Sequence, residues 1–169
     1  MQPKANNFTE RAWAAILSAQ ELAQNRKHQQ IETEHLFLAL IEQDGLVKEA
    51  LTHCGCSIKN LKDLLEKYLK DQPKLKSLPE SVYPGKSFTH IIEAANVSKI
   101  SLGDSFISVE HLLLAICSDT RCGRMFLEKE EISNKNLKGA IEKLRGNNKV
   151  TNQNPEANFE SLKKYGRDL

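Results

Sequence analysis

The sequence predicts an all-α protein built from two four-helix repeats that are related by a pseudo-two-fold axis. No stretch alternates convincingly between polar and apolar residues, whereas apolar residues recur at helical spacings along most of the chain. Residues 31–40 (IETEHLFLAL) return 76 positions later as residues 107–116 (ISVEHLLLAI). At this offset, residues 12–70 and 88–146 align without a gap and share 16 identities in 59 positions. One supersecondary unit is therefore used twice, and two such units packed together leave a shared groove.

The first repeat is predicted to open with a helix over residues 9–25. Thr9 is a suitable N-cap, and Phe8 before it can pack as a hydrophobic staple against Trp13. The residues expected to face the core are Ala12, Ile16, Ala19 and Ala23, with Trp13 and Leu17 widening the stripe.

Three more helices complete this repeat. The second runs from about Thr33 to Gln43 and ends at Gly45, and its interior 36–41 is apolar on every side, which is typical of a helix enclosed by others. A short third helix covers about 46–53 before Gly55. Ser57 is expected to cap the fourth helix, whose inward face is Ile58, Leu61, Leu65 and Tyr68.

Residues 71–86 hold three prolines and a glycine and are predicted to be a linker. The helical pattern then restarts, with Ser87 or Thr89 as the cap of a fifth helix. Ser108 is expected to cap the sixth helix, residues 121–128 to form the short seventh, and Ser133 to cap the eighth, which Gly146 follows. The inward residues of the fifth and eighth helices are Ile91, Ile92, Ala95, Val97, Leu137, Ala140, Ile141 and Leu144.

The expected organisation is a first repeat over 1–70, a linker over 71–86, a second repeat over 87–146 and a polar tail over 147–169. Pro155 is placed to open a short amphipathic helix through Phe159, Leu162 and Tyr165.

Composition narrows the class of function. The 24 basic and 22 acidic residues are well mixed, with a net charge of +2, so no basic stripe for nucleic acid is present. The longest apolar run, 36–41, is too short to span a membrane, and residues 1–7 have no apolar segment of a signal peptide. We therefore expect a cytoplasmic protein that binds neither nucleic acid nor membranes, with its four cysteines reduced.

Motifs for catalysis or metal binding are weak. The Gly85-Lys86-Ser87 triplet lacks the first glycine of a phosphate-binding loop, because position 80 is Glu. The Cys54-Gly55-Cys56 spacing is not that of a common zinc site. The repeated pairs Glu34-His35 and Glu110-His111 allow a metal or acid–base role, but a capping role in the first turn of a helix is the simpler explanation. We expect no enzyme activity in this chain, no cofactor and no metal.

The doubled Ile-x-x-Glu-His-Leu-x-Leu-Ala unit resembles the Clp N-terminal domain, an all-α module with pseudo-two-fold symmetry. Residues 103–115 (GDSFISVEHLLLA) are similar to the second repeat of the ClpB disaggregase type. Residues 145–169, with Arg145-Gly146, Asn154-Pro155-Glu156 and the final KYGRDL, resemble the segment that leads into the first AAA+ ATPase module of that type. The chain is therefore expected to be a piece of a longer protein.

The resemblance implies a substrate-recognition domain of a ClpB-type AAA+ protein disaggregase. Such a domain binds unfolded or aggregated polypeptide for ATP-driven threading by a module outside this chain. The implied partners are those polypeptides and the rest of a hexameric AAA+ chaperone, and the isolated domain is expected to be a monomer. The alternative is a free-standing Clp-N accessory protein without an ATPase that docks on a Clp protease core.

The resemblance also implies substrate-binding residues, which fall here on Thr9, Asp104 and Glu110. Each also has an ordinary structural role, as an N-cap, a loop acid and a first-turn carboxylate respectively. The positions that line an apolar groove in some relatives align near Ala94, Ser98 and His111. These side chains are small or polar, so the groove is expected to be weaker or to have a different preference.

Overall fold

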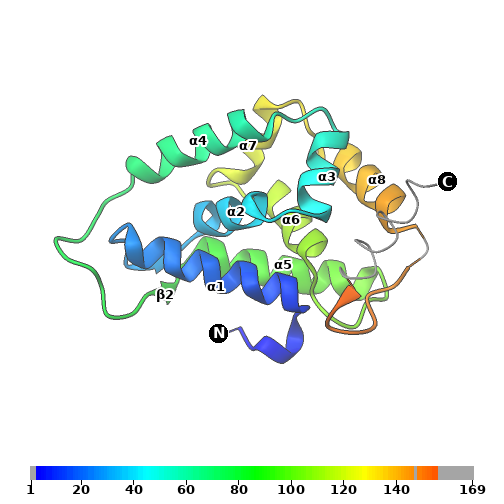
Figure 1. Ribbon diagram of the computed structural model, residues 1–169, viewed down its shortest axis with the longest axis horizontal. Coiled ribbons are helices and arrows are strands. Elements are labelled where there is room, and N and C mark those ends of the chain that lie inside the picture. The colour runs from blue at the N-terminus through cyan, green and yellow to red at the C-terminus, as the bar shows by residue number, and fades with distance from the viewer. Residues whose placement is uncertain (1–2, 147, 156–169) are drawn as a thin grey trace.

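The computed structural model describes residues 3–146 and 148–155, and within them eight α-helices dominate (Figure 1). The remaining regular structure is a 3-10 turn, η1 (Ala5–Asn7), and one pair of two-residue strands, β1 (Gln30–Ile31) and β2 (Tyr83–Pro84). The predicted all-α fold of two four-helix repeats is confirmed. The amphipathic helix expected from Pro155 to Tyr165 lies largely outside the described residues.

The helices of the first repeat are α1 (Glu10–Asn25), α2 (Thr33–Glu42), α3 (Leu46–His53) and α4 (Ile58–Lys70). Thr9 caps α1 through its side chain, which accepts a hydrogen bond from the Ala12 N–H at 3.2 Å. The expected staple is present, with the rings of Phe8 and Trp13 5.6 Å apart. Ser57 caps α4 in the same way. Leu17, expected to widen the buried stripe, is instead 48% exposed, because it lies a third of a turn away from Ile16.

The second repeat consists of α5 (Lys86–Ser101), α6 (Val109–Cys117), α7 (Gly123–Lys129) and α8 (Asn134–Arg145). The start of α1 and the start of α5 are 76 residues apart, and so are those of α2 and α6 and those of α4 and α8. Ser108 and Ser133 are N-caps as predicted. Val97, expected to point inward, is 66% exposed.

Two predicted helix starts in the second repeat were wrong. Gly85 rather than Ser87 or Thr89 precedes α5, because Ser87 accepts from the Thr33 N–H at 3.0 Å and donates to Glu32 at 2.8 Å. The α7 helix begins at Gly123, two residues late, because the Asp119 carboxylate accepts the N–H groups of Cys122 and Gly123, both at 2.8 Å. The contact that takes up Ser87 is distant in sequence, whereas the one made by Asp119 is local, with residues three and four positions along the chain.

The two enclosed helices, α2 and α6, lie in contact in the middle of the molecule (Figure 1). The long helices α1 and α5 pack on one side of them, and α3, α4, α7 and α8 lie on the other. The repeats exchange contacts reciprocally, with α1 on α6 and α5 on α2, and with α3 on α8 and α4 on α7. The hydrophobic core is therefore continuous across both repeats.

The backbone pairings between the repeats follow the same reciprocity. Ile31 of β1 pairs in parallel with Pro84 of β2, and an isolated parallel bridge joins Phe8 to Ile107. These two bridges involve equivalent positions at the 76-residue offset. In each case the residues before the long helix of one repeat pair with the residues before the central helix of the other, which locks the repeats together.

The linker lies against the first repeat. Leu75 N–H donates to the Lys27 carbonyl at 2.8 Å, Tyr83 N–H donates to the Gln29 carbonyl at 3.0 Å, and Val82 is buried.

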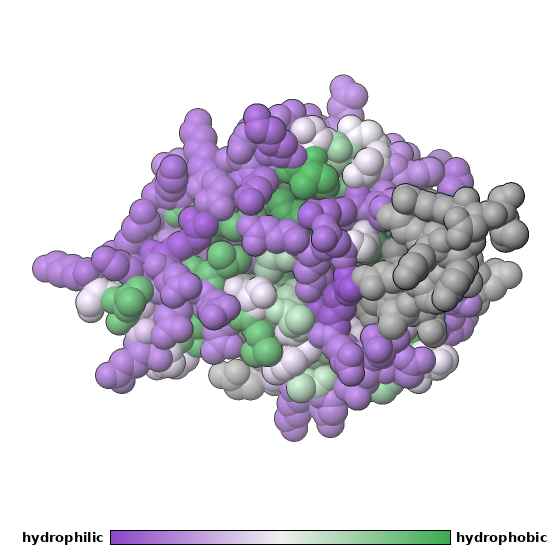
Figure 2. All heavy atoms as spheres, in the orientation of Figure 1, coloured by the Kyte–Doolittle hydropathy of each residue, from purple (hydrophilic) through white to green (hydrophobic). Residues whose placement is uncertain are grey.

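Figure 2 shows that the face in the same view as Figure 1 is mostly hydrophilic, with apolar residues toward its middle. None of the described helices is long and apolar enough to cross a lipid bilayer.

Candidate functional site

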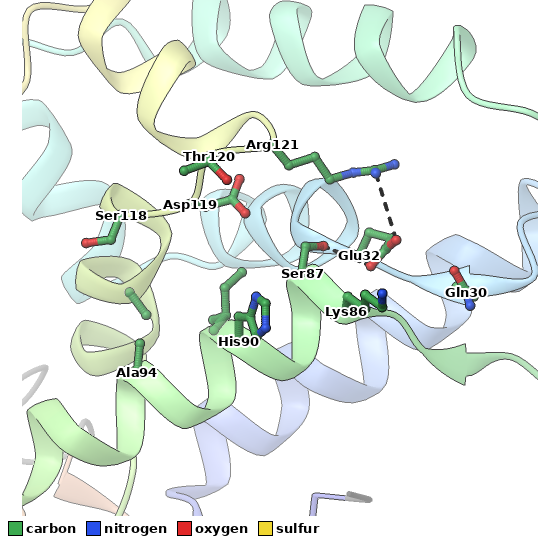
Figure 3. A pocket seen from close by; sticks show the side chains of 12 residues that line it. Gln30, Glu32, Lys86, Ser87, His90, Ala94, Ser118, Asp119, Thr120 and Arg121 are labelled. Atoms are coloured by element: carbon green, nitrogen blue, oxygen red, sulfur yellow. Dashed lines mark hydrogen bonds and ion pairs between the residues drawn. The ribbon is translucent and has the colours of Figure 1, made fainter.

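A hollow of about 610 Å³ lies where the repeats meet, and we call it the junction groove (Figure 3). The first repeat contributes Gln30 and Glu32, from the segment around β1. The second contributes one face of α5, the end of α6 and the loop before α7. The residues that line it are Gln30, Glu32, Lys86, Ser87, His90, Ile91, Ala94, Ala115, Ser118, Asp119, Thr120 and Arg121.

The junction groove combines an apolar base with a charged rim. Ile91, Ala94 and Ala115 are its apolar lining residues. The carboxylate of Glu32 accepts from Ser87, and that of Asp119 accepts from Thr33 at 2.7 Å as well as from two backbone N–H groups. The carboxylates of Glu32 and Asp119 are thus occupied within the fold, and so is the hydroxyl of Ser87.

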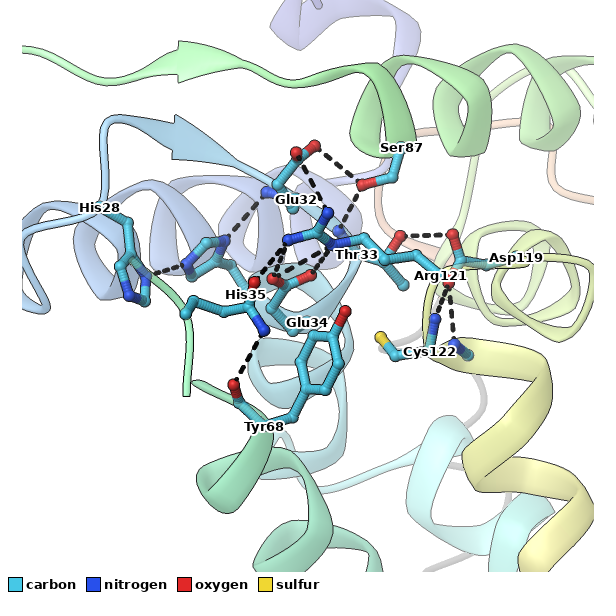
Figure 4. Close-up of polar contacts among 12 residues, drawn as sticks. His28, Glu32, Thr33, Glu34, His35, Tyr68, Ser87, Asp119, Arg121 and Cys122 are labelled. Carbon is cyan, nitrogen blue, oxygen red and sulfur yellow. Dashed lines mark hydrogen bonds and ion pairs between the residues drawn. The ribbon is translucent and has the colours of Figure 1, made fainter. Parts of the chain in front are cut away.

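Arg121 ties the rim of the junction groove to the first repeat (Figure 4). Its guanidinium donates from Nε and Nη2 to the two oxygens of Glu34, both at 3.0 Å, and from Nη2 to Gln72 at 2.9 Å. It also lies 5.9 Å from the centre of the Tyr68 ring. Because the Glu34 side chain is only 1% exposed, this bidentate pair neutralises a buried carboxylate of one repeat with a cation of the other.

Behind Glu34, a histidine pair continues the network of the first repeat. The Glu32 N–H donates to His35 Nδ1 at 2.9 Å, so this nitrogen carries no proton and His35 Nε2–H donates to His28 Nδ1 at 2.8 Å. The remaining His28 N–H, at Nε2, is buried without a partner among the described residues. Burial, with the neighbouring His28 and two arginines, lowers the pKa of His35 to about 3, so this ring is neutral. Burial and nearby cations also lower the pKa of His28.

The second repeat holds an equivalent network with different chemistry. The Ser108 N–H donates to His111 Nδ1 at 2.8 Å, and His111 Nε2–H donates to Asp104 at 2.7 Å. Arg145 donates to both oxygens of Asp104, at 2.7 and 3.0 Å, and its Nε lies 3.4 Å from Glu110. Burial alone would raise the pKa of Asp104, but the hydrogen bonds from Arg145, the Val150 N–H and His111 hold it below its usual value.

The predicted substrate-binding residues Thr9, Asp104 and Glu110 lie in or next to this second network, and none lines the junction groove. All three are buried, at 0, 7 and 3% exposure. The Thr9 N–H donates to the Ile107 carbonyl at 2.9 Å, Asp104 accepts four hydrogen bonds, and Glu110 accepts from the Ser108 hydroxyl. Their direct contact with a client would require these internal partners to move.

Of the positions expected to line a groove, the structure brings only Ala94 into the junction groove. Ser98 is half-buried outside it, and His111 is fully buried. Arg121 and Asp119, which lie in the loop before α7, were not among the predicted site residues. A signal was available, because the gap-free alignment sets Arg121 against Gly45 and Asp119 against Gln43, so both charges appear only in the second repeat.

No cluster suited to a metal ion is found in the part of the chain that the structure describes. His35 and His111 each use Nδ1 to accept a backbone N–H and Nε2 to donate to a neighbouring side chain. Burial raises the pKa of Cys117 and Cys56 to about 12, so these thiols are protonated and poor nucleophiles. The polar groups of both networks are hydrogen-bonded to one another within the fold.

Comparison with known families and proteins identifies the relatives of this chain. Residues 7–130 match the family described as the Clp repeat (R) N-terminal domain. The chain is 50% identical over 169 residues to the chaperone protein ClpB 1 of Parasynechococcus marenigrum, and 47% identical to ClpB of Prochlorococcus marinus. Each match covers 100% of this chain but 20% of the relative. The chain thus spans about a fifth of the length of these relatives.

Solved structures agree at the level of the fold. The Hsp104 N-terminal domain from Candida albicans superposes with a TM-score of 0.80 at 21% identity, over 89% of this chain and 99% of that one. A complex of the ClpV N-domain with a VipB peptide superposes with a TM-score of 0.64 at 14% identity, over 84% of this chain and 93% of that one.

Proposed function

The chain belongs to the Clp N-terminal domain family, and from this premise we propose that it recognises unfolded or aggregated polypeptide for a ClpB-type disaggregase. The observation that carries the proposal is the junction groove, an open hollow with an apolar base and a polar rim between the two repeats. A groove of this kind suits an extended segment, whose side chains find apolar surface while its backbone finds hydrogen-bond partners.

The size of the groove sets the expected strength of binding. About 610 Å³ has room for only a few side chains. The free energy from burying them is largely offset by the cost of association and of ordering a flexible client. Dissociation constants on the order of micromolar or weaker are expected for a single client segment. Weak binding suits a domain that must release its client to another part of the protein.

The remaining parts of the proposal concern the longer protein. ATP-driven threading and a hexameric AAA+ assembly are proposed for the longer protein, and this chain corresponds to about a fifth of the length of its ClpB relatives. One similar structure is a complex of the ClpV N-domain with a VipB peptide, which supports peptide binding as a property available to this fold. The alternative, an accessory protein that docks on a Clp protease core, predicts binding to a folded partner instead.

Thr9, Asp104 and Glu110 enter the proposal as residues that shape client handling from inside the fold. Their burial favours an indirect role, in which the cap of α1 and the Asp104–Arg145–Glu110 cluster hold neighbouring backbone in place. Substituting them is expected to lower stability as well as client binding, since each substitution leaves buried groups without partners.

A substitution at the base of the junction groove tests this function. Ala94→Trp fills the groove from an exposed position of α5, and Asn96→Trp places the same side chain on an exposed position of the same helix that does not line the groove. Fluorescence anisotropy with a labelled, reduced and carboxymethylated protein measures client binding, and melting curves check the fold. Ala94→Trp should weaken binding at least tenfold while Asn96→Trp leaves it unchanged. Equal binding by both variants would contradict a client site in the junction groove.

A further inference from the structure

The segment that follows α8 is bound to the domain as an extended peptide would be. The Val150 N–H donates to Asp104 at 2.9 Å, and the Val150 carbonyl accepts from the Ser105 N–H at 2.7 Å. The Val150 side chain is buried, although it lies outside the central cluster of apolar residues among those described. One residue is thus held by both of its backbone polar groups and by its side chain.

Contacts on either side of Val150 extend this mode of binding. The Arg145 guanidinium donates to the Asn148 carbonyl at 3.0 Å, and Lys149 Nζ donates to the Leu102 carbonyl at 2.7 Å. Further along, the Gln153 carbonyl accepts from the Glu10 N–H at 2.6 Å, and its side chain donates to the Phe8 carbonyl at 3.1 Å. Residues 148–153 therefore cross from the loop after α5 to the start of α1.

The groups that receive this segment are held in place by the second repeat. Asp104 is oriented by His111 and by both nitrogens of Arg145, and Glu110 lies against the Nε of the same arginine. Beside the segment lies a hollow of about 390 Å³, whose lining includes the apolar side chains of Leu102, Leu114 and Ile141. The Asp104 carboxylate as a fixed acceptor, the Ser105 N–H as a fixed donor and an adjacent hollow with some apolar lining are the parts of a peptide-binding site.

We propose that this surface is a second polypeptide-binding site, filled in this structure by the chain's own residues 148–153. The expected ligand is an extended peptide segment with a β-branched apolar residue at the position of Val150. It would be recognised mainly through hydrogen bonds to its main chain. The inference shares with the proposed function the idea that clients are polypeptides, but it concerns a different surface from the junction groove. The tethered segment has a high effective concentration, so it excludes a weak external peptide until it is released.

This arrangement gives Asp104, Glu110 and Thr9 a common role. Asp104 binds the segment directly, Glu110 helps to orient the arginine that binds Asn148, and Thr9 caps the helix whose first N–H binds Gln153. Residues buried under a bound segment can thereby act in client handling, since release of the segment exposes the groups that held it.

Val150→Asp is the central test, because it places a carboxylate against Asp104 and should release the segment without altering the central core. Thr151→Asp introduces the same charge at the adjacent exposed residue and serves as the control. The probe is a fluorescein-labelled peptide with the sequence of residues 148–154, and a peptide with Asp in place of Val is its negative control. Hydrogen exchange of residues 148–154 reports release, and melting curves report the fold.

The expected result is faster exchange of residues 148–154 in Val150→Asp, together with peptide binding at least tenfold tighter than to the unsubstituted chain or to Thr151→Asp. Should Val150→Asp fail to fold, Lys149→Ala combined with Gln153→Ala removes three of the segment's hydrogen bonds from exposed side chains and takes its place. Failure of the released chain to bind the peptide, equal binding by all chains, or a segment that stays protected in every variant would overturn the proposal.

Adding Ala94→Trp to the released chain separates this site from the junction groove. The added substitution should weaken binding of the carboxymethylated protein to the groove at least tenfold while binding of the short peptide stays the same. If the added substitution weakens binding of the short peptide as well as binding of the carboxymethylated protein, the two surfaces are one site and the inference fails. If Ala94→Trp affects neither ligand, the proposed function of the junction groove fails and the second site stands.

Discussion

Both repeats place a His at the same point of a central helix, but the side chain that accepts its N–H is a histidine in the first repeat and a carboxylate in the second. In each repeat the His is the third residue of its helix and accepts the N–H of the N-cap, so the local structure is the same. The His35 Nε2–H donates to His28, whereas the His111 Nε2–H donates to Asp104. His28 and Asp104 are equivalent at the 76-residue offset, so one aligned position sets the difference.

The difference extends to the arginines that neutralise the equivalent acids Glu34 and Glu110. Arg121 reaches Glu34 from the other repeat, whereas Arg145 reaches Glu110 and Asp104 from its own repeat. The first network therefore joins the two repeats, and the second joins a repeat to the segment that leaves it. The same helix start therefore serves different contacts in the two repeats, because the residues around the His differ.

Exchanging the two distinguishing residues should have unequal effects. Asp104→His leaves Arg145 and the Val150 N–H without their carboxylate, and losing one partner of a buried ion pair costs about 3 kcal/mol or more of unfolding free energy. His28→Asp gives the His35 N–H a charged acceptor close to Arg26 and Arg121, so stability should change by no more than about 1 kcal/mol. Urea titrations provide the measurement.

The exposed Asp63→His serves as the control for introducing a histidine. Equal losses of unfolding free energy from Asp104→His and His28→Asp would show that the two networks contribute equally to stability, which would contradict the predicted difference between them.

The pH dependence of stability should differ between the two histidines. The folded chain keeps His35 neutral, with its pKa lowered to about 3, while in the unfolded chain His35 binds a proton near pH 6.5. Stability is therefore complete above about pH 6.5 and falls with acidification, by about 2 kcal/mol at pH 5 for one such group. His35→Gln should remove this loss. Burial also lowers the pKa of His111, but Glu110 and Asp104 oppose the shift, so His111→Gln should flatten the profile less.

Melting curves between pH 7 and pH 5 test this, with the exposed His53→Gln as the control for replacing a histidine. A larger flattening from His111→Gln than from His35→Gln would reverse the comparison.

Two pairs of equivalent positions adopt the left-handed backbone conformation, with a glycine in only one member of each pair. Lys27 (φ 64°) matches Gly103 (φ 72°), and Glu131 (φ 59°) matches Gly55 (φ 86°). Because a Cβ is strained at positive φ, Lys27→Gly and Glu131→Gly should each raise the unfolding free energy by up to about 1 kcal/mol. Gly103→Ala and Gly55→Ala should lower it by a similar amount.

Denaturant midpoints measure these small changes. The exposed helical position Lys59, substituted by Gly, is the control and should lose about 1 kcal/mol from helix propensity. Destabilisation by Lys27→Gly would mean that the lysine side chain contributes more than its backbone strain costs.

Features that depend on neighbours in sequence were predicted well. The apolar spacing, the caps Thr9, Ser57, Ser108 and Ser133, and the limits of α3 follow from local rules, so they could be read without a structure. The predicted burial of Leu17 and Val97 was wrong because an apolar residue at the border of a stripe is buried only if another helix covers it. Ser87 failed as a cap because a partner in the other repeat takes its hydroxyl.

The candidate site shows the same division. The sequence by itself determined an all-α chain with a duplicated unit and a His in the first turn of each central helix, because helix periodicity and capping act over a few residues. Only the tertiary structure decided that Arg121 neutralises Glu34, that Asp104 binds residue 150, and that Thr9 and Glu110 are buried. Those contacts join residues far apart in the chain, and their strength comes from burial, which exists only once the repeats have packed.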